Sequence, residues 1–220
     1  MSDEAPGLLC VLTDVAAEHE QAWNRWYDTR HVPQRRAVPG FRDIGRYTAV
    51  EGIEGTRKYA ALYDLEGPSV LTTDAYQALS RPPESGDEDR EMLRRFQNSL
   101  RAVMVQIYPA ADQTPPRPGN VGAVLVVGLV PDAEHEEEYN AWYDEEHIPG
   151  LLPVPGVLRA RRFRAIEGAP RYLAIYEFSA PEVRHSEAFE RAIDTPWSTR
   201  IRRCVSRPVT GIYVPLEHAG

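Results

Sequence analysis

The chain has 220 residues, a formal net charge of −8 and 42% hydrophobic residues. This composition is typical of a soluble globular protein and excludes collagen-like, coiled-coil and wholly disordered chains. The acidic balance disfavours nonspecific binding to nucleic acid or to anionic membranes, so we expect neither as a partner.

The N-terminus, the apolar runs and the cysteines indicate in which compartment the protein is expected. Asp3 and Glu4 lie where a secretory signal peptide has basic residues followed by an apolar stretch. The longest apolar run, 121–130, is too short to cross a bilayer. Cys10 and Cys204 lack metal-ligand spacing and cannot build a disulfide framework. We therefore expect a cytoplasmic protein that needs no metal or other cofactor.

An eight-residue segment occurs twice in the chain. Segments 26–33 (WYDTRHVP) and 142–149 (WYDEEHIP) are identical at five of eight positions, at an offset of 116 residues. The same offset aligns the Val-Pro-Gly triplets 38–40 and 154–156. Shorter matches follow in the same order, and the last places the Ile-Tyr pair 107–108 over the pair at 212–213.

This ordered series of matches predicts a tandem duplication. We expect a first repeat at 1–110, a proline-rich linker at 111–120 and a second repeat at 121–220. Proline favours an extended path, so the linker should be semi-rigid.

Each repeat is predicted to run strand, helix, strand, strand, helix, strand. Short apolar or alternating runs predict eight strands, at 8–12, 41–50, 57–65, 103–108, 123–130, 157–166, 171–178 and 209–214. This order is that of a ferredoxin-like unit, whose bare sheet face needs a partner. The second repeat can supply that partner within the same chain.

Prolines mark the expected helix boundaries. Pro33 and Pro149 should end the first helices, because proline restricts the residue before it. The second helices should begin near Pro68 and Pro181, since proline suits the first turn of a helix. An insertion in the first repeat, 81–89, is predicted to be an exposed loop.

The repeated segment carries a family resemblance. Trp-Tyr-Asp-x-x-His-[Val/Ile]-Pro followed by a Val-Pro-Gly turn resembles the dimeric α/β-barrel superfamily, and is most similar to its EthD-like branch. The resemblance spans both copies. It implies an α+β fold in which two fused ferredoxin-like βαββαβ repeats form an intrachain dimeric α/β-barrel with antiparallel sheets. The chain would be a pseudo-dimer, with the option of pairing again as a homodimer.

Two histidines are the strongest catalytic candidates. Each follows an aspartate by three residues and a tyrosine by four, spacings that bring side chains together on a helical face. A carboxylate beside an imidazole fixes its tautomer and raises its basicity, which suits a general acid/base. The alternative is a histidine that only caps its own helix. The candidate residues are His147, His31, Asp144, Asp28, Tyr143 and Tyr27.

The two copies differ around the histidine. Arginines 35 and 36 follow the first histidine motif, whereas Leu151 and Leu152 follow the second. The apolar pattern is closer to that of the family, so His147 is favoured as the retained site. Aromatic and basic side chains nearby are candidates for substrate binding, with core packing as the alternative for the aromatics. These candidates are Trp26, Trp142, Arg46, Arg162, Tyr63 and Tyr176.

The leading functional hypothesis is a cofactor-independent lyase or isomerase. Its histidine would move a proton on a small apolar, aromatic or polyketide-like substrate during dehydration, decarboxylation, cyclisation or isomerisation. The resemblance leaves two alternatives open. One is a cofactor-free monooxygenase of a phenolic substrate, and the other is a non-catalytic carrier or sensor of an apolar small molecule or haem.

Overall fold

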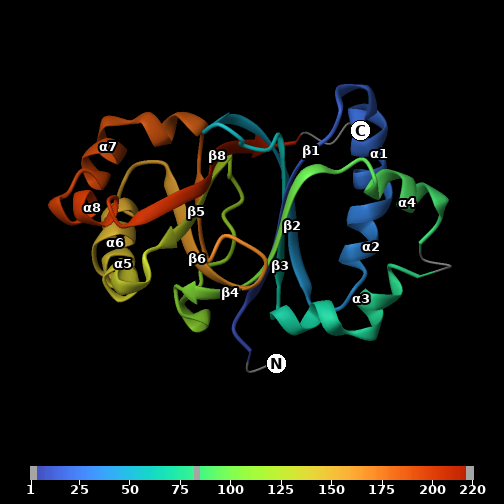
Figure 1. Cartoon of the computed structure of the whole chain (residues 1–220), viewed down its shortest axis with the longest axis horizontal. Coiled ribbons are helices and arrows are strands. Elements are labelled where there is room, and N and C mark those ends of the chain that lie inside the picture. The colour runs from blue at the N-terminus through green and yellow to red at the C-terminus, as the bar shows by residue number, and fades with distance from the viewer. Residues whose placement is uncertain (1–3, 82–84, 217–220) are drawn as a thin grey trace.

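The computed structural model describes residues 4–81 and 85–216 (Figure 1). Eight antiparallel strands close into one barrel in the order β1-β3-β2-β8-β5-β7-β6-β4. With helices outside the barrel, the fold is α+β, as expected from the sequence. The strands are β1 (Gly7–Asp14), β2 (Phe41–Gly52), β3 (Tyr59–Leu65), β4 (Gln97–Tyr108), β5 (Ala123–Pro131), β6 (Val157–Glu167), β7 (Tyr172–Phe178) and β8 (Val205–Pro215).

The four strands of each half of the chain lie side by side in the barrel. In each half the first and third strands are central, and the second and fourth are at the edges. Edge strand β2 pairs with β8, and edge strand β4 pairs with β6. Main-chain hydrogen bonds across these two seams remove the free edges that an open sheet would expose.

Side chains alternate between the barrel interior and the helical layers, as the pleat of a strand requires. On β5, Val124 and Val126 pack inside the barrel with residues of the first half, such as Leu8. Leu125 and Leu129 on the same strand pack outward against helices. The barrel interior is therefore a core built jointly by both halves.

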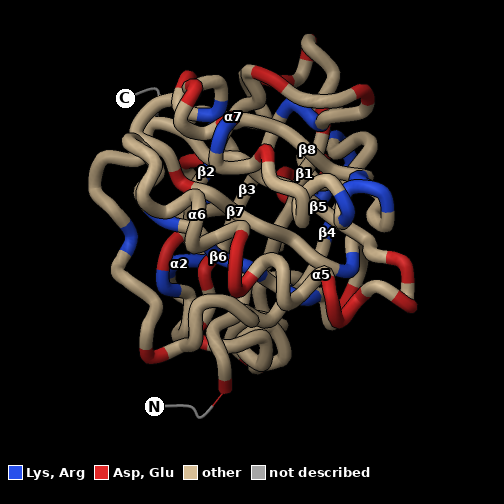
Figure 2. The backbone as a smooth tube through the Cα atoms, turned by 90° about the vertical axis from the view of Figure 1, so that its left-hand side faces the viewer, with Lys and Arg blue, Asp and Glu red and all other residues tan. Residues whose placement is uncertain are grey.

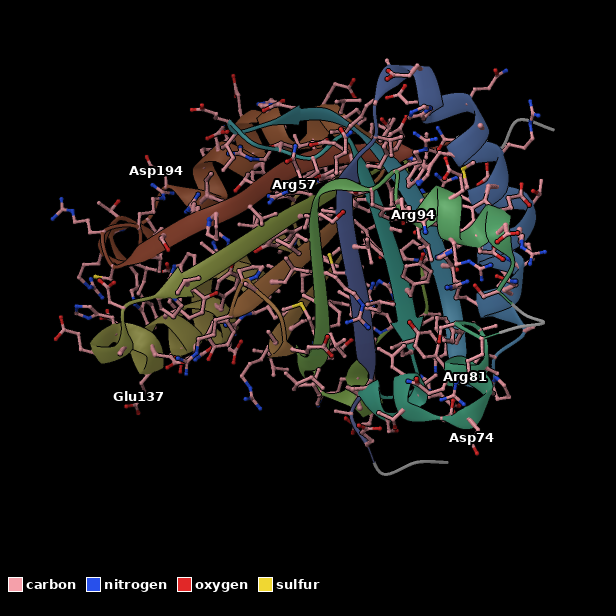
Figure 3. All side chains as sticks on the ribbon, turned by 45° about the vertical axis from the view of Figure 1, so that its right-hand side comes forward. Arg57, Asp74, Arg81, Arg94, Glu137 and Asp194 are labelled. Carbon is pink, nitrogen blue, oxygen red and sulfur yellow. The ribbon has the colours of Figure 1, made fainter. Side chains whose placement is uncertain are left out.

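Two groups of helices cover opposite sides of the barrel (Figure 1). Charged side chains such as Asp74 and Glu137 project outward from them (Figure 3), and acidic and basic positions are interspersed on the side of the second group (Figure 2). The first group comprises α1 (Glu20–Trp26), α2 (Val32–Arg36), α3 (Asp74–Ala78) and α4 (Asp87–Leu93). The second comprises α5 (Glu136–Trp142), α6 (Ile148–Leu151), α7 (Glu187–Ile193) and α8 (Pro196–Ile201).

The expectation that the first helices end before proline is wrong. A π-helical turn, Tyr27–His31, joins α1 to α2, and a second one, Tyr143–His147, joins α5 to α6. Pro33 and Pro149 are then the second residues of α2 and α6, within the first turn, where a missing N–H costs little. Such π-turns are frequent at functional sites.

The second helical segments are broken into short pieces. Each begins with a 3₁₀ turn at Pro68–Thr72 or Pro181–His185, as the prolines predicted, and two α-helices follow. Part of the predicted loop 81–89 is instead helical, because α4 begins at Asp87 and the Asp89 carboxylate accepts from the Gly86 N–H at 2.8 Å. Residues 82–84 of that loop lie outside the described residues.

The last strand of each half starts earlier than predicted, at Gln97 and Val205. The strand register also shows that the last sequence match between the halves, the Ile-Tyr pair 107–108 over the pair 212–213, is wrong. Leu8 on β1 faces Met104, whereas Val124, at the corresponding position of β5, faces Tyr213. Tyr213 therefore corresponds to Met104 rather than to Tyr108. The Ile-Tyr match arose because alternating apolar strands contain many similar dipeptides.

The linker crosses one end of the barrel. Arg117 donates to the Asp43 carboxylate and, at 2.5 Å, to the Tyr47 hydroxyl. Arg159 donates to the Pro115 carbonyl at 3.2 Å. These bonds hold the segment between the halves against the barrel mouth. Among the described residues, no helix is long and apolar enough to span a membrane.

Candidate active site in the second half

A buried arginine holds the π-turn in each half. Arg46 on β2 donates to the Asp28 carboxylate and, at 2.6 Å, to Asn24 Oδ1. Its guanidinium carbon lies 4.1 Å from the ring centroid of Tyr27, a cation–π distance.

Arg162 on β6 makes the same three contacts. It donates to Asp144 at 2.6 Å and to Asn140 Oδ1 at 2.7 Å, and its guanidinium carbon lies 4.1 Å from the Tyr143 ring centroid. Its side chain is only 2% exposed. Arg46 and Arg162 do point inward to a carboxylate, but that carboxylate belongs to the protein itself.

The expected aspartate–histidine pairs are not what the π-turns produce. Asp28 and Asp144 bind arginines, and Nδ1 of His31 and of His147 is buried without a hydrogen-bond partner among the described residues. A π-turn holds more residues than an α-turn because its hydrogen bonds join i and i+5. Residues three apart then point to different sides, whereas the tyrosine and histidine four apart remain in contact.

Aromatic stacking positions both imidazoles. The His147 ring stacks on Trp142 with centroids 4.2 Å apart and meets Tyr143 edge-on at 5.1 Å. Burial lowers the pKa of His147 to about 3, and the positive charges of Arg207 and Arg202 contribute to the shift. Burial likewise lowers the pKa of His31 well below its ordinary value. Both rings are therefore neutral at physiological pH.

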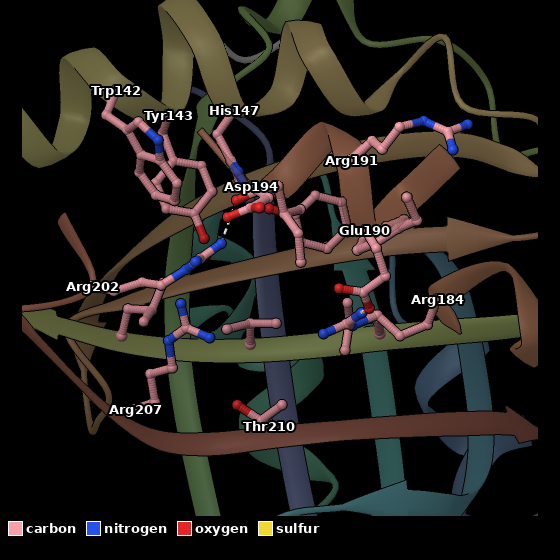
Figure 4. Close-up of a pocket in the computed structure, with 16 residues that line it drawn as sticks. Trp142, Tyr143, His147, Arg184, Glu190, Arg191, Asp194, Arg202, Arg207 and Thr210 are labelled. Atoms are coloured by element: carbon pink, nitrogen blue, oxygen red, sulfur yellow. Dashed lines mark hydrogen bonds and ion pairs between the residues drawn. The ribbon is translucent and has the colours of Figure 1, made fainter. Parts of the chain in front are cut away.

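A pocket of about 430 Å³ opens beside His147, between the sheet and the second helical layer (Figure 4). This volume is within the range of small-molecule sites. The sequence-predicted residues Trp142, Tyr143, His147 and Tyr176 meet in its wall. The remaining lining residues are Leu125, Val127, Leu129, Arg184, Phe189, Glu190, Arg191, Ile193, Asp194, Arg202, Arg207 and Thr210.

The corresponding region of the first half is filled. Tyr27 and Arg46 line a gap of only about 10 Å³, about the space of one water molecule. The Phe96 ring occupies this region, packing on Trp23 and Tyr27 with centroids 5.2 Å and 6.2 Å away. His31 instead borders a separate hollow of about 160 Å³.

Tyrosine hydroxyls mark the same difference. Tyr27 and Tyr63 hydrogen-bond at 2.5 Å in the first half. In the second half the Tyr176 hydroxyl is buried, and no described group meets ordinary hydrogen-bond geometry with it. The Tyr176 hydroxyl does interact with Tyr143, so the two halves differ in the geometry of this contact.

The tryptophans have different anchors. Trp26 Nε1 donates to Asp89 at 2.9 Å, and Arg30 donates to the same carboxylate at 2.7 Å and 2.8 Å. Trp142 Nε1 donates instead to the Ser198 hydroxyl at 3.2 Å. Trp26 borders the small hollow near His31, not a developed pocket.

Sequence reasoning missed the charged part of the pocket. Arg202 and Arg207 belong to a run of four arginines within positions 200–207, which was the available signal. Phe189 of α7 gave no signal distinct from core packing. Among the described residues, no group of three or more His, Cys, Asp or Glu side chains could hold a metal ion.

Comparisons with known proteins address the fold. No family model and no curated protein matches the chain. A proposed monooxygenase from Fusobacterium nucleatum subsp. nucleatum shares 9% identity at a TM-score of 0.66, covering 98% of this chain and 94% of that one. An anthrone oxidase-like protein shares 10% at 0.65, with 98% and 93% covered. A chlorite dismutase from Candidatus Nitrospira defluvii shares 10% at 0.61, with 98% and 92% covered.

The chain has the dimeric α/β-barrel fold. The expected fold is thus confirmed, and the likeness shows the fold alone. At these identities the likeness carries no reaction with it, because one fold hosts many chemistries.

Proposed function

We propose that the chain is a cofactor-independent enzyme that moves a proton on a small aromatic or polyketide-like substrate, with His147 as the general acid/base. One observation carries the proposal. His147 lies in the wall of a pocket of about 430 Å³, whereas the equivalent space in the first half is filled. Dehydration, decarboxylation, cyclisation and isomerisation need only such a proton and a cavity that excludes water.

The roles of the neighbouring groups follow from their contacts. Trp142 fixes the plane of the His147 imidazole by stacking on it, and the Arg162 guanidinium packs on the ring of Tyr143. The neutral imidazole can accept a proton from a bound substrate. Burial and the nearby arginines lower the pKa of His147, so a substrate group that neutralises those arginines would strengthen the base.

The finer family assignment is part of the proposal. We infer that the halves are tandem ferredoxin-like repeats of EthD-like type, with a boundary at 111–120. The supporting observations are the same strand order in each half and the matching contacts of Arg46 and Arg162. The second half would have kept the ancestral pocket, and the first would have filled it.

A second candidate is cofactor-free oxygenation of a phenolic substrate. The observation favouring it is the presence of a proposed monooxygenase and an anthrone oxidase-like protein among the structural neighbours. Both candidates begin with removal of a proton by His147. They differ in whether molecular oxygen is then consumed.

Deuterium incorporation tests the shared step without knowledge of the natural substrate. Aryl 1,3-diketones and aryl β-keto acids would be incubated with the protein in D₂O, and exchange at the carbon between or beside the carbonyls followed by NMR. We expect exchange that falls at least about 100-fold in His147→Gln and persists in the matched His31→Gln variant. Undiminished exchange in His147→Gln would overturn the proposal, and an oxygen electrode separates the two candidates.

A further inference from the structure

The pocket wall carries more positive than negative charge. Four arginines line it, against Glu190 and Asp194. Two of the four are engaged: Arg184 pairs with Glu190 at 2.5 Å, and Arg191 pairs with Glu187 at 3.3 Å. The other two, Arg202 and Arg207, decide the character of the site.

Neither of these two arginines has a carboxylate partner within the described chain. Arg202 donates to the main-chain carbonyl of Ile193, and Arg207 makes no hydrogen bond or ion pair with a described residue. Figure 4 shows both on one side of the pocket, below Tyr143, while Arg184 and Arg191 lie on the other side. A pair of guanidinium groups at the rim of an apolar cavity is a receptor for a planar anion.

Other parts of the wall are suited to a ring. Trp142 and Phe189 present aromatic surface, and β5 contributes the aliphatic side chains of Leu125, Val127 and Leu129. Apolar walls with a few fixed polar groups give orientation as well as affinity.

We propose that the substrate of this pocket is an aromatic carboxylate whose carboxylate group binds Arg207 and Arg202 while its ring lies against Trp142, Phe189 and β5. This inference rests on the proposed function and names the class of its substrate. The orientation places the part of the ligand distant from the carboxylate beside His147.

A bound carboxylate at this position would also affect His147, whose pKa is lowered first by burial and then by nearby arginines. Arg207 and Arg202 both oppose protonation of His147. A bound carboxylate neutralises their charge and raises the pKa of the imidazole, because an opposite charge nearby favours the charged form. The substrate thus improves its own catalytic base, and an analogue without the carboxylate loses that effect.

Equilibrium binding of matched probes tests the proposal. Isothermal titration calorimetry at pH 7 would compare 2-naphthoate with 2-naphthalenemethanol and 2-naphthol, which share the ring system and lack the charge. We expect 2-naphthoate to bind at least about tenfold more tightly than either neutral probe, in line with a charge-assisted hydrogen bond. Arg207→Gln should remove that advantage, while the exposed Arg203, which does not line the pocket, supplies the control Arg203→Gln.

Each result has a defined meaning. Equal binding of the three probes, or an unchanged preference in Arg207→Gln, overturns the carboxylate site. Exchange that depends on His147 together with equal probe binding leaves the proposed function standing and overturns this inference. If binding of 2-naphthoate depends on Arg207 but no exchange depends on His147, the carboxylate site stands and the proposed function is overturned.

Discussion

The hydroxyl groups of Tyr27 and Tyr63 hydrogen-bond to each other at 2.5 Å inside the first half. At the equivalent position of the second half, the buried Tyr176 hydroxyl interacts with Tyr143 but does not reach the geometry of an ordinary hydrogen bond. The two halves thus share one architecture, with the site in a closed form in the first half, where the gap is about 10 Å³, and in an open form in the second, where the pocket is about 430 Å³. The short Tyr27–Tyr63 hydrogen bond stabilises the first half, whereas the looser Tyr143–Tyr176 contact stabilises the second half less.

The tyrosine pairs should respond differently to loss of a hydroxyl. Tyr63→Phe leaves the fully buried Tyr27 hydroxyl without its partner, which should lower the free energy of unfolding by about 1–3 kcal/mol. Tyr176→Phe removes a hydroxyl whose contact with Tyr143 falls short of ordinary hydrogen-bond geometry, so its effect should be below about 0.5 kcal/mol or stabilising. Urea unfolding of the two variants checks this, and equal losses would contradict the assignment.

The Asp89 carboxylate should be a major anchor of the first helical layer. It accepts hydrogen bonds from Trp26, Arg30 and the Gly86 N–H, and its own side chain is 7% exposed. Asp89→Ala strands the buried indole N–H and leaves Arg30 unpaired by this carboxylate, so we expect a loss of about 2 kcal/mol.

The second half supplies the matched control. Ser198→Ala removes the hydroxyl that accepts from Trp142 at 3.2 Å, a neutral bond whose loss should cost about 1 kcal/mol. Thermal unfolding at pH 7 compares the two variants. A larger effect of Ser198→Ala would show that Asp89 is not the anchor that its contacts indicate.

Much of the fold could be predicted because its signals are local and periodic. Alternating apolar residues located all eight strands, and the repeated Trp-Tyr-Asp segment located both first helices. Helix continuation through Pro33 could not be predicted, since it depends on a π-turn stabilised by Arg46 from another element. The early start of β4 likewise depends on pairing with β1, a long-range contact.

The site could be predicted only in part for the same reason. His147, Tyr143 and Trp142 are adjacent in sequence and carry a recognisable motif. Arg207 reaches the pocket from the last strand, more than 50 residues away, and nothing in its own neighbourhood indicates a cavity. The partner of Asp144 was also not visible, because Arg162 is brought to it by the packing of β6 against the π-turn.

The buried histidines should make the protein less stable in mild acid. Burial lowers the pKa of His147 to about 3 and that of His31 well below the ordinary 6.5. Below pH 6.5 the unfolded chain therefore binds more protons than the folded chain. The free energy of unfolding consequently decreases as the pH is lowered. Each histidine contributes a slope of up to about 1.4 kcal/mol per pH unit.

Urea unfolding between pH 6.5 and 5 measures this slope before most carboxylates titrate. His147→Gln should remove one of the two contributions and halve the slope, and a double variant with His31→Gln should nearly abolish it. A slope that is unchanged in both single variants would show that neither imidazole is buried in its neutral form.

A variant whose pocket is filled should lose ligand binding and keep nearly the same stability. Val127 on β5 lines the 430 Å³ pocket, so the larger ring in Val127→Phe enters open space and should change stability by less than about 1 kcal/mol. Val11, at the equivalent position of β1, lines the gap of about 10 Å³. Val11→Phe overpacks that region and should cost about 1–3 kcal/mol.

The same pair of variants tests where the ligand binds. We expect Val127→Phe to abolish binding of 2-naphthoate, because its ring occupies the space between β5 and Phe189. Val11→Phe should leave the affinity unchanged in the folded fraction, since Val11 lines only the gap of about 10 Å³ and not the pocket beside His147. Calorimetric titration of both variants with 2-naphthoate decides the matter. Retained binding in Val127→Phe would place the ligand elsewhere and remove the basis for assigning the open form of the site to the second half.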